Sequence, residues 1–195
     1  ANDGSATKRR CIPGVTSIRL FENPTDIPDT YWGQTHWLEI LAQGGDDTAI
    51  ATAIQSARTY TVNLLGTTTV TIPDAFTPSG DKDINFSRPA DVDVWVTLTI
   101  TKGEGYSSDT SPAAITARED AIKAQIVAWG ATRAVGLNVS AGQIAAQAMA
   151  TPTVPGIFEI SGFVGIVPAP VTTSVIADVR ELLVFAAVRI VLVGV

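Results

Sequence analysis

The sequence predicts an α+β fold, in which mixed or antiparallel sheets and a few helices form two small subdomains. Apolar and polar residues alternate strictly over residues 91–101, which is typical of a strand with one buried face. Residues 115–129 instead carry apolar side chains at steps of seven, four and three, which predicts a helix with one apolar stripe. Pro-Gly pairs at 13–14 and 155–156 each precede a strand-like segment. These patterns place both kinds of element in one chain, as the α+β class requires.

The first subdomain is predicted over residues 1–88 and is strand-rich, with one helix at about 46–58. Residues 15–21 alternate in polarity, which predicts a strand with one apolar face. Residues 23–33 are predicted to be a loop, because their two prolines lack a backbone donor and bias the preceding residue away from helix. Further strands are predicted at 35–42, 66–73 and 84–89, with a turn-rich connection at 74–83.

Residues 44–47, Gly-Gly-Asp-Asp, bear on whether the chain is an enzyme. They could form the acidic hairpin of a nucleotide cyclase, a glycine loop that cradles phosphate, or the start of a helix. Apolar residues follow at helical spacing, at positions 50, 53, 54 and 57. Asp46 and Asp47 then lie at a helix N-terminus, where they cap it and repel phosphate. The pattern therefore predicts a strand, a glycine turn, an aspartate cap and a helix.

The second subdomain is predicted over residues 89–195, with two helices on a sheet built around residues 92–101. Its helices are expected at about 112–130 and 140–150, and its other strands at 154–167 and 187–195.

Helix-capping residues support both of these helices. Ser111 is placed to cap the first helix, and a proline follows at the first helical position, where a missing N–H has no cost. Gly130 or Gly136 can end this helix. Ser140 and Gln143 have the spacing of a capping box at the start of the second.

The composition is apolar and poor in charge. Hydrophobic residues make up 46% and charged residues 16% of the 195 residues, below the quarter or so typical of soluble domains. Either other subunits cover part of the surface, or a surface rich in Thr and Ala is polar without charge. The net charge of −6 and the pI near 4.6 disfavour binding to nucleic acid, which requires Lys and Arg against phosphates.

Both ends of the sequence favour a protein without membrane segments. The N-terminal stretch is polar, and no apolar run follows it, so no signal peptide is predicted. Its basic cluster, Lys8-Arg9-Arg10, is expected to be a solvated turn. The apolar run at 182–195 is shorter than a membrane span and contains Arg189, so it is predicted to be a buried strand.

The sequence offers no assembled catalytic, metal or cofactor site, and we expect none. His36 is the only histidine, and no nucleophile-elbow motif accompanies it, so a packing or surface role is expected. Cys11 is the only cysteine, which excludes a disulfide within the chain and leaves too few ligands for zinc. A basic trio precedes Cys11 and could lower its pKa, but a buried, inert thiol is the simpler expectation. Neither a P-loop lysine nor a dinucleotide-binding glycine motif is present.

Two further groups of residues suggest chemistry. Asp91 and Asp93 lie on one strand face about 7 Å apart, a spacing compatible with glycosidase acids. A solvated face that blocks edge pairing is the simpler interpretation. The aromatic residues Tyr31, Trp32 and Trp37 could stack on a sugar, or pack in a core or an interface.

Several motifs in order resemble the baseplate J-like family, the wedge proteins of contractile phage tails and related injection systems. They are "IPGVTSIRLFEN", "GGDDTAIATAI", "GTTTVTI" and "INFSRPADVDVWVTLTI", followed by a helix, "VSAGQIAAQA" and "VPGIFEI". The resemblance covers nearly the whole chain, although its motifs are turns and strands rather than catalytic signatures. Members of the family are usually longer at the N-terminus, so a fragment is expected, and residues 58–66 fit the family pattern poorly.

The resemblance implies a structural subunit of a baseplate wedge and not an enzyme. Other wedge and hub proteins and further copies of the chain would be its partners, in a virion tail baseplate assembled in the host cytoplasm. No nucleic acid, membrane or cofactor partner is implied. Two other classes stay open from the residues alone: a carbohydrate-binding or adhesin-type tail module that uses Tyr31, Trp32 and Trp37, and an enzyme that uses the aspartates at 46–47 or at 91 and 93.

Overall fold

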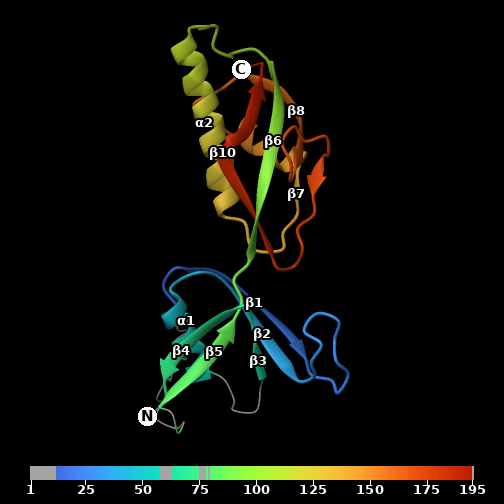
Figure 1. The fold of residues 1–195 in the computed structure, drawn as a ribbon. Coiled ribbons are helices and arrows are strands. Elements are labelled where there is room, and N and C mark those ends of the chain that lie inside the picture. The colour runs from blue at the N-terminus through green and yellow to red at the C-terminus, as the bar shows by residue number, and fades with distance from the viewer. Residues whose placement is uncertain (1–11, 58–62, 75–77, 79, 195) are drawn as a thin grey trace, which may run out of the picture. The chain divides into compact units, whose positions relative to one another are not determined.

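The computed structural model describes residues 12–57, 63–74, 78 and 80–194, and it confirms the predicted α+β class. Three helices and four small sheets, with parallel and antiparallel pairings, lie in this part of the chain. Contacts divide the chain into two compact units, Ala1–Pro89 (unit 1) and Ala90–Val195 (unit 2). Figure 1 shows the elements of each unit. Cys11, the basic trio at 8–10 and residues 58–62 lie outside the described residues.

Unit 1 combines a three-stranded sheet, a hairpin and one helix. The sheet has the order β1-β2-β3; β1 is antiparallel to β2, and β2 is parallel to β3. The antiparallel hairpin β4-β5 and the helix α1 enclose the core with this sheet. The elements are β1 (Val15–Asn23), β2 (Trp37–Gly44), α1 (Asp47–Ala57), β3 (Asn63–Leu65), β4 (Thr68–Pro73) and β5 (Asp81–Phe86).

The apolar core of unit 1 lies between α1, the hairpin and one face of the sheet. Its buried members are Ala42, Ile50, Ala51, Ile54, Leu64, Ile72, Ile84 and Phe86. The predicted strand at 15–21 forms as β1, but two of its apolar residues, Ile18 and Leu20, are 52% and 64% exposed. The reason is that β1 is the edge strand, while α1 packs on the hairpin β4-β5 and leaves this edge uncovered.

Unit 2 is a three-stranded sheet with two helices on one face. The sheet has the order β10-β6-β8, with β10 parallel and β8 antiparallel to the central β6. Figure 1 shows α2 running beside β10, and α3 packs on β8. The elements are β6 (Ala90–Lys102), α2 (Pro112–Ala131), β7 (Val139–Ser140), α3 (Ala141–Met149), β8 (Ile157–Gly165), β9 (Ser174–Val175) and β10 (Glu181–Val193).

The alternation in β6 produces the core of unit 2 as predicted. Val94, Val96, Leu98 and Ile100 are buried against Ile122 and Ile126 of α2 and Ile144 of α3. The residues between them point to the opposite face, which no helix of this unit covers.

The predicted helix caps are confirmed. The Ser111 hydroxyl accepts a hydrogen bond from the Ala114 N–H at 3.3 Å. Ser140 and Gln143 form the capping box, with reciprocal bonds of 3.1 and 3.2 Å. Gly130 does not end the first helix, which continues to Ala131. This glycine is buried, and a Cβ there would lie 2.4 Å from a ring carbon of Phe185, so its role is close packing of α2 on β10.

Several strand boundaries differ from the prediction, among them the starts of β5, β2 and β10. β5 begins at Asp81, inside the predicted turn-rich connection, because side chains of β4 bond across to it; Thr71 Oγ1 donates to Asp83 Oδ1 at 2.6 Å. β2 begins at Trp37 and not at Thr35, because the chain bends at residues 35–36. β10 begins at Glu181, earlier than predicted, and its register against β6 shifts between Phe185 and Ile190.

Candidate functional site

The Gly-Gly-Asp-Asp turn joins β2 directly to α1. Gly44 and Gly45 have φ values of 71° and 77°, a conformation that favours glycine. A Cβ on Gly44 would lie 2.3 Å from the Gly14 carbonyl oxygen, so the turn also packs closely against the start of β1. Asp46 Oδ1 accepts from the Ala49 N–H at 2.9 Å, which confirms the predicted aspartate cap. The turn is therefore a strand-to-helix connection and not the tip of a hairpin, as a cyclase loop would be.

Arg88, which the sequence analysis did not single out, binds to this turn. Its guanidinium donates to the carbonyl oxygens of Ala42, at 3.0 Å, and Gly45, at 2.9 Å. It also donates to the Gly44 carbonyl oxygen and forms an ion pair with the Asp47 carboxylate. We call this arrangement the Arg88 clamp. It joins the turn after β2 to the last residues of unit 1, more than forty positions later in the chain.

Contacts within the chain engage both aspartates of this turn. Asp46 bonds the first turn of α1, and Asp47 pairs with a cation supplied by the chain itself. Within the described ranges, no three His, Cys, Asp or Glu side chains gather where they could hold a metal ion. An open groove of ≈ 620 Å³ runs along α1, but apart from Asp46 its lining is uncharged.

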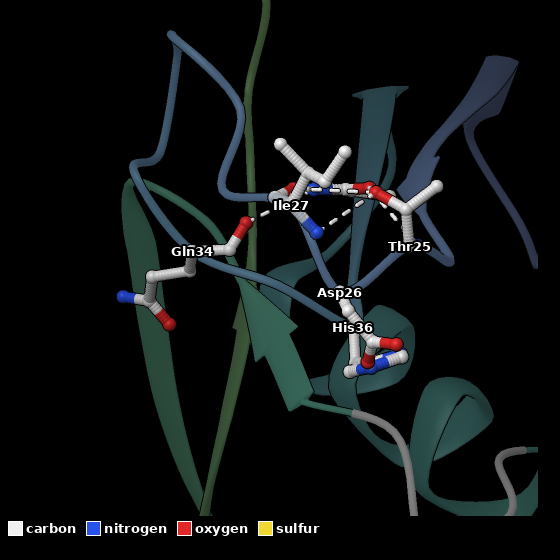
Figure 2. A network of polar contacts seen from close by, with 6 residues as sticks. Thr25, Asp26, Ile27, Gln34 and His36 are labelled. Atoms are coloured by element: carbon white, nitrogen blue, oxygen red, sulfur yellow. Dashed lines mark hydrogen bonds and ion pairs between the residues drawn. The ribbon is translucent and has the colours of Figure 1, made fainter.

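A thirteen-residue loop, 24–36, connects β1 to β2, and a network of polar contacts that involves Thr25, Ile27 and Gln34 organises it (Figure 2). The Asn23 amide nitrogen donates to the carbonyl oxygens of Ile27, at 2.8 Å, and Gln34, at 3.0 Å. Its side-chain oxygen accepts from the backbone and the hydroxyl of Thr25. Because Asn23 is only 8% exposed, one buried amide holds both ends of the loop in place.

A buried carboxylate anchors the other side of this loop. Glu39 in β2 is fully buried and accepts from Trp32 Nε1 at 3.2 Å and from the Ser87 hydroxyl at 2.6 Å. The loop itself turns around Asp29, whose side chain accepts from the N–H groups of Trp32 and Gly33. The carboxylate thus links the loop to the segment that leaves unit 1.

The three predicted aromatic residues do not form one open platform. Tyr31 and Trp32 meet edge to face, with ring centroids 5.2 Å apart, and Tyr31 is 56% exposed. Trp37, by contrast, is 5% exposed and lies within unit 1. A sugar could therefore stack on Tyr31 but not on Trp37, which removes part of the surface that a carbohydrate-binding module would need.

His36 lies at the surface, just before β2 and not inside a strand. Its Nε2 atom is 2.6 Å from Asp26 Oδ1, and both side chains are largely exposed (Figure 2). No serine or cysteine nucleophile is bonded to this pair among the described residues. The expectation of a surface residue is confirmed, although the backbone is left-handed here, with φ of 51°.

Asp91 and Asp93 are both exposed at the start of β6. They lie in the part of β6 that pairs with β10 alone, because the pairing with β8 begins at Trp95, so their position fits the simpler interpretation of a solvated face beside an unpaired side of the strand. Asp93 pairs with Arg189 at 2.8 Å, and Arg189 also donates to the Val184 carbonyl oxygen at 3.1 Å. This contact holds the register shift of β10 in place, which gives the carboxylate a structural role.

Unit 2 carries two exposed apolar surfaces. On the open face of its sheet, Thr97 of β6 lies between its strand partners Val191 and Phe163, and both of these apolar residues are about half exposed. We call this the open sheet face. The second surface is the segment 166–179, which includes β9. Its exposed apolar residues Ile166, Val167, Val171 and Ile176 line a groove of ≈ 270 Å³, and Val179 is exposed in the same segment. Exposed apolar groups that cluster in this way are typical of interaction sites.

One carboxylate has a shifted pKa. Hydrogen bonds from the backbone N–H and the side chain of Ser111 hold the pKa of Asp109 below its usual value of 3.8. Asp109 Oδ1 accepts from the Ser111 N–H at 2.8 Å, directly before α2. The shift reflects a helix entrance, not an acid poised for catalysis.

Comparisons with known proteins give no family assignment. No protein-family model matches the chain, and no curated protein matches it either. In the part of the chain that the structure describes, no helix is long and apolar enough to cross a membrane.

Proposed function

We propose that the chain is a structural subunit of a contractile-tail baseplate wedge, which acts through protein–protein contacts in a multi-copy assembly. Its partners are other wedge and hub proteins and further copies of the chain. This proposal assigns no catalytic role and no cofactor to the chain.

The observation that carries the assembly role is the exposed apolar surface of unit 2. Val171 and Ile176 are 82% and 78% exposed. Polar residues such as threonine occur in the same segment, so these exposed positions are not apolar merely because the whole segment is. Contact with a partner would remove these side chains from water, at about 25 cal/mol per Å² of apolar area buried. Together with the low charge content, this surface is typical of a protein that works within an assembly.

The wedge family is supported by the order of motifs in the sequence, and one contact adds to that support. The Arg88 clamp joins the motif "GGDDTAIATAI" to the segment "INFSRP", which stands later in the sequence. Two motifs that resemble the family thus form one structural unit. The enzyme alternative gains nothing from the geometry, because Asp46, Asp47 and Asp93 each bond to another part of the chain.

Co-purification of the chain with the products of its neighbouring genes tests the proposal. We expect a stable complex whose mass, measured by light scattering, exceeds the 20.4 kDa of one chain. The double variant Val171→Asp and Ile176→Asp should weaken the complex without unfolding unit 2, because both side chains are largely outside its core.

A matched control places a charge at an exposed polar residue of the same unit. Thr116→Asp on α2 should leave the complex intact, because residue 116 lies outside both apolar surfaces. A chain that binds none of these proteins would contradict the proposal, and so would an activity that is lost when Asp46 and Asp47 are changed to Asn.

A further inference from the structure

The end of unit 1 is fixed by hydrogen bonds up to its penultimate residue. Ser87 is 2% exposed and pairs with β2; its N–H donates to the Ile40 carbonyl at 2.8 Å, and its carbonyl accepts from the Ala42 N–H at 3.0 Å. Its hydroxyl also donates to the buried Glu39 carboxylate. Arg88 follows and is held by the clamp. The backbone therefore belongs to unit 1 through Ser87, and the next residue, Arg88, is held to the unit by its side chain.

Unit 2 is fixed from its first residue onward. The Ala90 N–H donates to the Arg180 carbonyl at 3.0 Å, and Ala90 pairs with Glu181 at the start of the β6–β10 ladder. The next pairs, Asp91 with Leu182 and Val92 with Leu183, continue without a break. No residue of β6 is therefore left to act as a flexible connection.

Pro89 alone separates these two fixed ends. Its ring fixes φ near −65°, and it disfavours the helical region for Arg88, which restricts ψ of that residue as well. The torsion left with the widest freedom is ψ of Pro89. Such a joint permits rotation about one bond but little bending, unlike a flexible linker of several glycines.

We propose that Pro89 is a single-residue hinge between the two units and that the Arg88 clamp is its fixed mount. This inference does not depend on the proposed function, because it follows from the contacts of residues 87–90. The mount fixes the position and direction at which the chain leaves unit 1. If the clamp opens, the flexible segment extends back from Pro89 toward Ser87, and the orientation of the units is less restricted.

Distances between spin labels in the full chain test this hinge. One label is placed on α1 by Ser56→Cys and one on α2 by Ala117→Cys, both at exposed positions, after the native Cys11 has been changed to serine. A second pair within unit 2, Ala117→Cys with Glu159→Cys, supplies the width expected for a rigid body.

We expect the distance distribution between the units to be broader than the distribution within unit 2. Pro89→Gly should broaden it further, by about twofold, because a second backbone torsion becomes free. Arg88→Ala should broaden it as well, and Arg88→Lys should broaden it less, since lysine keeps the charge but lacks the planar fork. The pair within unit 2 should not change in any variant.

Two results would overturn the proposal. One is a distribution between the units that is as narrow as the control pair and is unchanged in Pro89→Gly, because the units would then be held together by more than their linker. The other is an unchanged width in both Arg88 variants, because the clamp would then not be the mount. Pro89→Gly keeps every contact of the clamp, so it stays informative even if Arg88→Ala destabilises unit 1.

Discussion

Removal of the Arg88 side chain is the most informative perturbation of unit 1. Arg88→Ala deletes hydrogen bonds to the carbonyl oxygens of Ala42, Gly44 and Gly45 and the ion pair with Asp47. The side chain is 28% exposed and the Asp47 carboxylate 51% exposed, so solvent screens part of the charge.

The magnitude follows from these contacts. Each of the two part-buried bonds, to Ala42 and Gly45, contributes on the order of 1 kcal/mol net, because water solvates the same groups when the chain unfolds. The exposed bond to Gly44 and the screened ion pair together add about 0.5–1 kcal/mol. The variant should therefore lower the free energy of unfolding of unit 1 by about 2.5–3 kcal/mol.

Urea unfolding followed by hydrogen exchange and mass spectrometry measures this loss separately in each unit. Amides of β2 and α1 should exchange faster in Arg88→Ala, while amides of β6 keep their protection. Arg88→Lys serves as the matched variant, with a loss of about half as much because the charge remains. A loss below about 0.5 kcal/mol would refute the reasoning, since a bonded clamp could not then be present in solution.

Three further predictions concern single side chains. Asp46→Ala should lower the free energy of unfolding by about 1–2 kcal/mol through loss of the α1 cap, and should remove no activity; chemical denaturation of the purified variant measures this. Glu39→Ala should lower the free energy of unfolding by about 2–4 kcal/mol, because two donors lose their acceptor in a buried site. Denaturation followed by tryptophan fluorescence, to which Trp32 contributes, measures this loss, and an unchanged midpoint would contradict the role of the carboxylate. The pKa of Asp109 is lower in the folded state, so its contribution to stability is present above pH 3.8 and is lost as the pH falls through the lower folded pKa. An NMR titration of the carboxyl carbon should give a pKa below 3.8, and Ser111→Gly should raise this pKa.

The elements that the sequence predicted well are those whose signal is local. The strict alternation in β6 needs only one buried face to be recognised, and the Ser140–Gln143 capping box is complete within four residues. The aspartate cap at Asp46 is of the same kind, because helical spacing follows it immediately in the sequence. Such signals do not depend on what the segment packs against.

The features that the sequence did not predict depend on contacts between distant residues. In the sequence alone, Arg88 cannot be distinguished from any other arginine before a proline. Its role depends on a contact with the turn after β2, which is more than forty residues away in the sequence. Glu39 is acidic yet buried, and Leu20 is apolar yet exposed, which is the opposite of what their polarity alone predicts. The order of the strands in the sheet explains both positions. The same holds for Trp37, which was grouped with two neighbouring aromatic residues by sequence proximity and is buried.

The mass of the chain in solution, alone and with the products of its neighbouring genes, is the direct measure of the proposed assembly role. Sedimentation velocity across a range of concentrations provides this measurement. We expect species well above the 20.4 kDa of one chain, and we expect them to be lost in the Val171→Asp and Ile176→Asp double variant. A chain that sediments as a 20.4 kDa monomer at every concentration and in every mixture would contradict an assembly role.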